Sequence, residues 1–341
     1  MNIYLLNATL NGKILSEILC RELVIKGMIT LNKNGGGKTP EYYDYKDFCN
    51  ERKIECIQLN SYNFSDEDDK RKVKQLEIDL IIVASWQRLI PSWLIQKCTI
   101  GIIGAHGSHE GITRGRGRSP QNWALMMGKT HFSISIFWIE EGTDNGAVID
   151  TREFEYIPTD SILTSYIKSN LYKVDMILKN IENGKIANRE GTMQTEQGYY
   201  LPQRKKEDGM IDWNRDAMDI NNMVRALTKP YPGAFTQCED IDFIIWSSRP
   251  VVVDDVHYLY DSVENGTIIS ILEDSALIKC GKNLLLVESC TNYDKLREGM
   301  ILESSDYRNQ MQEIIERHRE KYNTPLSPLV LDELEKYRQQ L

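Results

Sequence analysis

The chain has 341 residues, of which 41% are hydrophobic and 27% are charged, and its formal net charge is −9 at pH 7. This length exceeds what one hydrophobic core usually serves, so we expect two domains of an ordinary soluble, globular type. No apolar run approaches the roughly 18 residues of a membrane span, and the first residues lack the basic region of a signal peptide. The seven cysteines are scattered without CxxC spacing, which argues against a metal site or a disulfide framework. We therefore expect a cytoplasmic protein that does not associate with membranes.

The C-terminal part of the chain is acidic. Residues 206–341 contain 15 Lys and Arg against 25 Asp and Glu. Proteins that bind nucleic acids neutralise phosphates with Lys and Arg, and their binding domains are usually basic. The charge therefore argues against a nucleic-acid partner, with a local basic patch as the open alternative.

Apolar runs and amphipathic stretches alternate along the first 83 residues. Between the apolar runs, the stripe from Ile14 to Leu23 and residues 45–52 and 67–76 predict helices. The runs themselves are typical of strands and lie at Asn2–Leu6, Met28–Leu31, Ile54–Leu59 and Leu80–Val83. This alternation predicts an α/β fold with a mostly parallel, Rossmann-like sheet and helices on both faces.

Residues 99–149 contain the side chains suited to catalysis. Thr99–Ala105 predicts a buried strand that ends near His106, and a loop rich in Gly and Arg follows. Pro120 predicts the start of a helix, and a second strand then leads to Asp144. Ligands of open α/β sheets bind at the carboxyl ends of strands, where a His and an Asp can meet as a base and its orienter. On spacing alone, a buried structural His beside a carboxylate is the more common alternative.

The second half of the chain predicts a long helix, a β-rich module and a helical end. Helices are expected from about residue 160 to Asn183 and at Asn214–Thr228, with a linker or hairpin at 186–203 between them. Five short runs predict a small antiparallel barrel of the OB type: Ile241–Trp246, Val251–Tyr258, Thr267–Leu272, Ala276–Cys280 and Leu284–Glu288. Two charged helices are expected at 308–322 and 331–341. They either pack on a second copy of the chain in a homodimer or present a solvated face.

Two blocks of the sequence resemble the 10-formyltetrahydrofolate-dependent formyltransferases. In the first block, a predicted strand is followed by His106-Gly107-Ser108, an Arg-Gly pair and Pro120 at the start of a helix. A second strand and the turn Asp144-x-Gly146 come next. The second block, at residues 201–236, is similar to the segment after the catalytic domain in methionyl-tRNA formyltransferases and in enzymes that formylate nucleotide-linked amino sugars. The resemblance covers about residues 75–290 and implies a catalytic domain at 1–203, an OB-like domain at 204–300 and a helical tail at 301–341.

The resemblance implies an N-formyltransferase that moves the formyl group of 10-formyltetrahydrofolate to an amine. His106 would accept the proton of the attacking amine, and Asp144 would orient the imidazole. The family also has a catalytic Asn two residues before the His, and this chain has Gly104 there. That Asn normally supplies a donor to the oxyanion. We expect Asn122 to replace it, with Ser108 as the second candidate.

The loop after residue 83 resembles the family loop whose backbone receives the pterin ring. The resemblance assigns folate contacts to Trp86, Arg88, Leu89 and Ile90 in this loop. It also assigns them to Ile139 and Glu141, which follow the strand predicted before Asp144. From the residues alone, the first of these segments is more typical of a strand-to-helix turn with Pro91 at the helix start.

For the acceptor, the acidic charge favours a nucleotide-linked amino sugar over tRNA, of the kind used in lipopolysaccharide O-antigen synthesis. Guanidinium groups match phosphate oxygens, so Arg114, Arg116 and Arg118 are expected to bind this substrate together with Ser108. A solvated loop is an equal alternative for these arginines. Three other functions stay open: a methionyl-tRNA formyltransferase, a folate-binding protein that has lost catalysis with its Asn, and a hydrolase that uses water in place of the amine.

Overall fold

The computed structural model describes residues 1–337 except 38, 40, 143 and 254. By the density of its internal contacts, the chain divides into two compact units. The first unit comprises Met1–Arg116, Ser133–Phe154 and Tyr166–Gly198. The second comprises Gly117–Phe132, Glu155–Ser165 and Tyr199–Leu341, so the two units alternate along the sequence.

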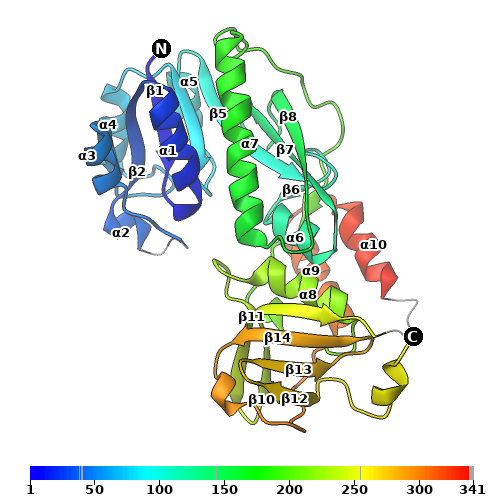
Figure 1. Ribbon diagram of the computed structural model, residues 1–341. Helices are drawn as coiled ribbons and strands as arrows, with labels where there is room; N and C mark the ends of the chain where they lie inside the picture. The colour runs from blue at the N-terminus through cyan, green and yellow to red at the C-terminus, as the bar shows by residue number, and fades with distance from the viewer. Residues whose placement is uncertain (38, 40, 143, 254, 338–341) are drawn as a thin grey trace. The chain divides into compact units, whose positions relative to one another are not determined.

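A seven-stranded sheet forms the frame of the first unit, in the order β3-β2-β1-β4-β5-β7-β8 (Figure 1). The first five strands of that order are parallel, and β7 runs antiparallel to β5. The strands are β1 (Ile3–Asn7), β2 (Ile25–Leu31), β3 (Glu55–Leu59), β4 (Leu80–Ser85), β5 (Gly101–Ser108), β7 (His131–Trp138) and β8 (Val148–Glu155). The expected mostly parallel, Rossmann-like sheet is therefore confirmed.

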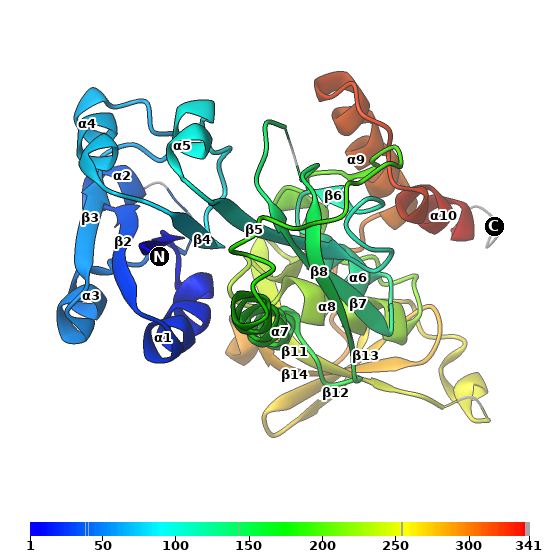
Figure 2. The same cartoon turned by 90° about the horizontal axis from the view of Figure 1, so that it is seen from above.

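Helices cover both faces of this sheet. Figure 2 shows α1 (Lys13–Glu22) and α3 (Lys46–Arg52) on one face, and α4 (Glu67–Gln75) and α5 (Ser92–Lys97) on the other. The central strands read as continuous apolar runs because side chains on both faces are buried, as in other parallel sheets. The long helix α7 (Ile162–Glu182) confirms the helix expected from residue 160 to 183.

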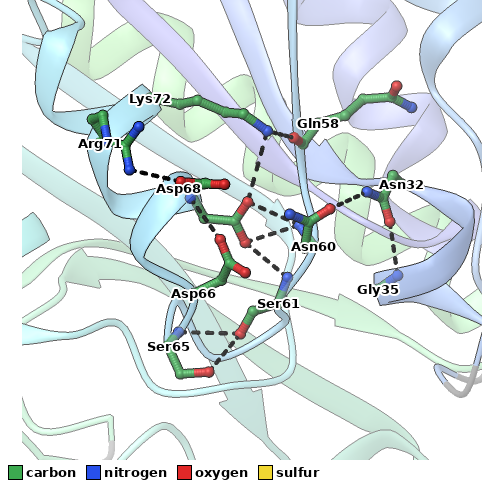
Figure 3. Close-up of polar contacts among 11 residues, drawn as sticks. Asn32, Gly35, Gln58, Asn60, Ser61, Ser65, Asp66, Asp68, Arg71 and Lys72 are labelled. Carbon is green, nitrogen blue, oxygen red and sulfur yellow. Dashed lines mark hydrogen bonds and ion pairs between the residues drawn. The ribbon is translucent and has the colours of Figure 1, made fainter.

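A buried carboxylate holds the carboxyl end of β3 beside that of β2 (Figure 3). Asp69 on α4 accepts hydrogen bonds from the backbone N–H groups of Asn60 (2.8 Å) and Ser61 (2.8 Å). Asn60 in turn accepts from the side-chain amide of Asn32 at 2.6 Å, and Asn32 caps the one-turn helix α2 (Lys33–Gly36) through Gly35 N–H. Side chains thus satisfy backbone donors that neither the sheet nor a helix uses.

The second unit contains a five-stranded antiparallel sheet in the order β10-β11-β14-β13-β12. Its strands are β10 (Ala234–Cys238), β11 (Ile241–Val251), β12 (Ile268–Leu272), β13 (Ser275–Lys279) and β14 (Leu284–Cys290). The predicted strand Val251–Tyr258 is wrong, because the N–H of Val253 donates to the side chain of Asn283 (3.1 Å) instead of a neighbouring strand. A 3-10 turn, His257–Tyr260, follows. The fifth strand is β10, which directly precedes β11.

Helices complete the second unit. They are α6 (Pro120–Met126), α8 (Ala217–Leu227), α9 (Tyr307–Lys321) and α10 (Pro328–Lys336). A separate two-stranded sheet consists of the short strands β6 (Arg116–Gly117) and β9 (Tyr200–Leu201). The expected tail helices are present as α9 and α10, and residues 338–341 of the second expected helix lie outside the described residues. One face of α9 is solvated, and the other buries Tyr307, Met311, Ile314 and Ile315.

A buried cation holds α10 in place. The guanidinium of Arg215 lies 3.7 Å from the ring centre of Tyr307 and donates to the hydroxyl of Tyr337 at 3.0 Å. The same hydroxyl donates to Asp219 at 2.7 Å.

In the described part of the chain, no helix is both long and apolar enough to cross a bilayer.

Candidate active site

His106 and Asp144, predicted to form a catalytic pair, lie together in the first unit. His106 is near the carboxyl end of β5, where it pairs with Ser135 of β7. Its Nδ1 is 3.5 Å from Oδ2 of Asp144, and its Nε2 is 2.7 Å from the carbonyl oxygen of Gly115. The two side chains are 12% and 22% exposed, so both are partly shielded from water and both can be reached by a ligand.

Both nitrogens of the His106 ring face acceptors. A carbonyl oxygen can only accept a hydrogen bond, and an ionised carboxylate likewise only accepts. A neutral imidazole has one N–H, so only the doubly protonated ring satisfies Gly115 and Asp144 together. To accept a proton at Nε2, His106 has to give up its contact with Gly115.

The backbone turn that presents Asp144 is strained and tightly packed. Asp144 has φ of 51°, in the left-handed region that non-glycine residues seldom adopt. Gly146 follows, and a Cβ there would lie 1.7 Å from the carbonyl oxygen of Trp138, so only glycine fits. A strained residue in a fixed turn is typical of functional sites.

Gln194 ties this turn to the loop that contacts His106. Its amide nitrogen donates to the carbonyl oxygens of Asp144 (2.9 Å) and Gly146 (2.8 Å). Its carbonyl oxygen accepts from the guanidinium of Arg116 at 2.8 Å, one residue beyond Gly115. One side chain therefore connects the backbone on the Asp144 side of the imidazole with the loop on its other side.

Gly104, where the family has its catalytic Asn, lies on β5 against an apolar side chain. A Cβ at this position would be 2.4 Å from Cδ1 of Ile139. Ile139 is fixed by a backbone hydrogen bond from its N–H to the carbonyl oxygen of Ile102 at 2.7 Å. The space beside Gly104 is thus filled by Ile139.

The two candidates for the replacement donor have partners of their own. Asn122 on α6 is 2% exposed, and its amide nitrogen donates to the carbonyl oxygen of Ala226 on α8 at 2.6 Å. No acceptor is present among the described residues for its second N–H, and its carbonyl oxygen is buried without a partner there. Ser108 donates to the carbonyl oxygen of Gly111 at 2.7 Å. Asn122 belongs to the second unit and His106 to the first, so the role of Asn122 as replacement donor stays a prediction.

The three arginines expected to bind the acceptor have different environments. Arg116 is buried, and its guanidinium is held by Gln194. Arg114 is half exposed and lies 3.8 Å from Glu110. Arg118 donates its backbone N–H to Leu201 at 3.4 Å. Arg114 and Arg118 are both exposed, and Arg118 belongs to the second unit.

Three of the six residues expected to contact folate pack against one apolar cluster of the first unit. Trp86, Ile90 and Ile139 pack against the buried core that contains Ile102. Leu89 is 68% exposed, and the guanidinium of Arg88 lies over the ring of Tyr62 at 5.4 Å. Glu141 is exposed in the turn before Asp144, and its carbonyl oxygen accepts from Asn145 at 3.0 Å.

Two family models match this chain. The model described as "Formyl transferase" matches residues 33–176, and "Formyl transferase, C-terminal domain" matches residues 204–298. Together they cover the candidate pair and the antiparallel sheet, in the order expected of two-domain members. The chain belongs to the formyl transferase family.

Relatives within and around the family are distant. A methionyl-tRNA formyltransferase of Geobacter metallireducens is 27% identical over 222 residues, which are 64% of this chain and 67% of that protein. HypX from Aquifex aeolicus, solved in complex with tetrahydrofolic acid, matches 96% of this chain and 58% of its own with a TM-score of 0.61 and 16% identity. The Helicobacter canadensis N-formyltransferase, solved with folinic acid and dTDP-3-aminofucose, matches 85% of this chain and 99% of its own with a TM-score of 0.57 and 14% identity. The chain spans from 49% to 60% of the HypX structures that it matches.

Gln194 and the carbonyl of Gly115 were not expected from the sequence. Gln194 lies 50 residues after Asp144 in an irregular segment, where an amide side chain has no pattern to distinguish it. A backbone carbonyl has no residue signature at all. For Gly115 there is one local signal, because a Cβ there would lie 2.0 Å from that of Ser108, so the position requires glycine.

Proposed function

We propose that this formyl transferase moves the formyl group of 10-formyltetrahydrofolate to the amine of a nucleotide-linked amino sugar. The observation that carries the proposal is the pairing of His106 with Asp144 at 3.5 Å at the carboxyl end of β5. The family uses 10-formyltetrahydrofolate as its donor, which supports the one-carbon chemistry.

In this mechanism the free amine attacks the formyl carbon of the donor. A new C–N bond forms, the carbonyl oxygen becomes an oxyanion, and the nitrogen becomes cationic. His106 accepts the surplus proton of that nitrogen while Asp144 stabilises the resulting imidazolium. The bond between the formyl carbon and N10 of the folate then breaks, and the imidazolium returns the proton to N10.

The contact between Nε2 and Gly115 sets a condition on this cycle. His106 can accept a proton only after the Gly115 carbonyl moves away from Nε2. We infer that substrate binding displaces the loop at residues 109–115, which exposes Nε2 to the amine. Gln194 and Arg116 hold the loop immediately beyond Gly115, so the displacement stays local.

For the donor, we propose that the pterin ring binds beside the apolar cluster of Trp86, Ile90 and Ile139. The backbone of residues 86–90 offers N–H and C=O groups that can pair with the edge of a flat, amide-like ring. Arg88 lies beside the cluster and can pair with a carboxylate of the folate tail. Leu89 and Glu141 complete the folate set.

For the acceptor, the acidic second half of the chain supports a nucleotide sugar over tRNA. The Helicobacter canadensis neighbour was solved with such a sugar, dTDP-3-aminofucose. Arg114 is the guanidinium we propose for the diphosphate, since its only described carboxylate contact is a 3.8 Å pair with Glu110. Ser108 precedes the same loop in the sequence and Arg118 follows it, and Arg116 is held by Gln194.

The test is to incubate the purified protein with 10-formyltetrahydrofolate and a panel of dTDP- and UDP-linked amino sugars. Formation of the formamide is followed by mass spectrometry, and charged initiator tRNA serves as a second acceptor. The variant His106→Asn is the control, and its turnover should fall by at least about a hundredfold while folate binding is retained. Transfer to tRNA alone, or turnover of His106→Asn within about tenfold of the parent, would reject the proposal.

The side chain of Ile139 beside Gly104 favours one second candidate, a folate-binding protein that does not transfer formyl groups. Such a protein lacks the oxyanion donor, and loss of one donor lowers turnover about a hundred- to a thousandfold. It would bind 10-formyltetrahydrofolate and form no formamide with any acceptor of the panel. Release of formate without an acceptor would instead indicate a hydrolase.

A further inference from the structure

A buried lysine of the second unit has no carboxylate partner. Lys279, at the end of β13, is 9% exposed, and its ammonium donates to the side chain of Asn265 at 3.1 Å and to the carbonyl oxygen of Cys280. An ammonium has three donors, so one is left for another acceptor. No carboxylate of the described residues lies within ion-pairing distance of it. A buried charge is costly unless it is paired, so this position favours an anion.

Lys279 forms a wall common to two adjoining cavities. The smaller, of about 290 Å³, is also lined by His257, Tyr260 and Lys282. The larger, of about 630 Å³, is also lined by Glu264 and by other residues including Glu303. Asp261 and Gly281 line both cavities. His257 and Lys282 line only the smaller cavity and Glu264 and Glu303 only the larger, whereas Lys279 and Asp261 line both.

The backbone around Lys279 is fixed before any ligand binds. The N–H of Gly281 donates to the carbonyl oxygens of Trp213 (2.8 Å) and Arg215 (3.0 Å), and a Cβ at 281 would lie 1.9 Å from the carbonyl oxygen of Asn214. The side chain of Asn283 accepts from Val253 N–H, which attaches the wall containing His257 to the turn after β13. Because the site is already ordered, ligand binding costs less conformational entropy than it would at a flexible site.

We propose that these cavities form a second binding site for a small phosphorylated amine, such as an amino-sugar phosphate. The phosphate is bound by Lys279 and Lys282, which both line the smaller cavity. The protonated amine points into the larger cavity, towards Glu264 and Glu303. The ring of Tyr260 supplies an apolar surface for the body of the ligand.

Every residue of this site belongs to the second unit, and none belongs to the proposed folate or acceptor set. The proposal therefore stands on the charges and the cavities, independently of formyl transfer. Its test is direct binding, so a failure of the activity assay and a failure of this site remain distinguishable. His106→Asn should bind the phosphorylated amine as the parent does.

The experiment is isothermal titration calorimetry of the full chain with glucosamine 6-phosphate. Glucose 6-phosphate, glucosamine and inorganic phosphate are the comparison probes. Charge-assisted contacts are each worth roughly a factor of ten or more in affinity. We expect glucosamine 6-phosphate to bind at least about tenfold more tightly than each comparison probe.

Variants assign the two ends of the site. Lys279→Met should lower the affinity about tenfold or more, and Lys282→Met, on the exposed turn, should lower it by a similar factor if Lys279→Met fails to fold. Glu264→Gln should reduce the preference for the amine over glucose 6-phosphate. Lys295→Met removes an exposed cation of the same unit and should change nothing. Equal binding of inorganic phosphate and glucosamine 6-phosphate, or full affinity in both Lys279→Met and Lys282→Met, would overturn the proposal.

Discussion

The side chain of Ile139 fills the space into which a side chain at Gly104 would project, with Cδ1 at 2.4 Å from the position of a Cβ. The sequence resemblance implies that the oxyanion donor of the family corresponds to Gly104. In this chain the residue after β7 has taken that volume, so glycine at 104 and isoleucine at 139 are matched to each other. A side chain at 104 therefore requires the end of the Ile139 side chain to shift.

Gly104→Asn alone should therefore destabilise the protein by about 1–3 kcal/mol through overpacking, with no gain in turnover. The double variant Gly104→Asn/Ile139→Ala has room for the amide and should recover the lost stability and raise turnover above that of Ile139→Ala alone. Urea unfolding and formyl-transfer rates check the two effects. A double variant no faster than Ile139→Ala would show that a donor at 104 does not act in this site.

Asn122 is the proposed donor in place of the family Asn. Asn122→Ala should slow the chemical step by roughly a hundredfold. It also removes the hydrogen bond to Ala226 and should lower the free energy of unfolding by about 1 kcal/mol. Asn180→Ala is the matched control, because Asn180 is also buried and donates to the backbone of its own helix at Met176. If both variants lose stability equally and neither loses turnover, Asn122 is only a packing residue.

Gln194 is a positioning residue in the proposed mechanism. It contacts the backbone that presents Asp144, and it does not contact the substrate. Gln194→Ala should lower kcat about tenfold with KM nearly unchanged. Gln194→Glu should be worse, because a carboxylate cannot donate to the carbonyls of Asp144 and Gly146. Steady-state kinetics test this, with Gln237→Ala as the control for loss of an exposed glutamine. A change confined to KM would contradict the positioning role.

Asp144→Ala should lower turnover by at least a hundredfold, because the imidazole of His106 loses the group that orients it and stabilises its cation. Folate binding, followed by fluorescence titration, should remain within a few-fold of the parent. Circular dichroism has to show a folded variant before the rates are compared. A folded variant with near-parental turnover would remove Asp144 from the mechanism.

Lys173 on α7 gives the protein a pH-dependent stability. Burial lowers the pKa of Lys173 from 10.5 to about 8. Between these values the unfolded chain holds a proton that the folded chain does not, so the free energy of unfolding rises from pH 8 to 10.5. Lys173→Met should stabilise the protein at pH 7 by about 1–3 kcal/mol and remove this rise. Denaturant unfolding at pH 7 and at alkaline pH checks it, and Lys179→Met, an exposed lysine paired with Asp175, should leave the slope unchanged.

The elements that position His106 and Asp144 were predictable because their signals are local. A short apolar run marks β5, Pro120 marks the start of α6, and Asp-x-Gly marks the turn at Asp144. The role of Gln194 was not predictable, since it depends on a hydrogen bond across 50 residues of sequence. The same reason explains the wrong strand at Val251–Tyr258: its valines favour a strand, but Asn283, 30 residues later, takes the backbone donor at Val253.

The contact of Arg215 with Tyr337 makes the last helix part of the folded interior. A chain that stopped before residue 337 would leave this buried guanidinium without the hydroxyl that it shares with Asp219. A nonsense mutation that removes Tyr337 would thus act as a core mutation does. Protein shortened there should be cleared by cellular proteases, although every residue of the candidate site would still be present.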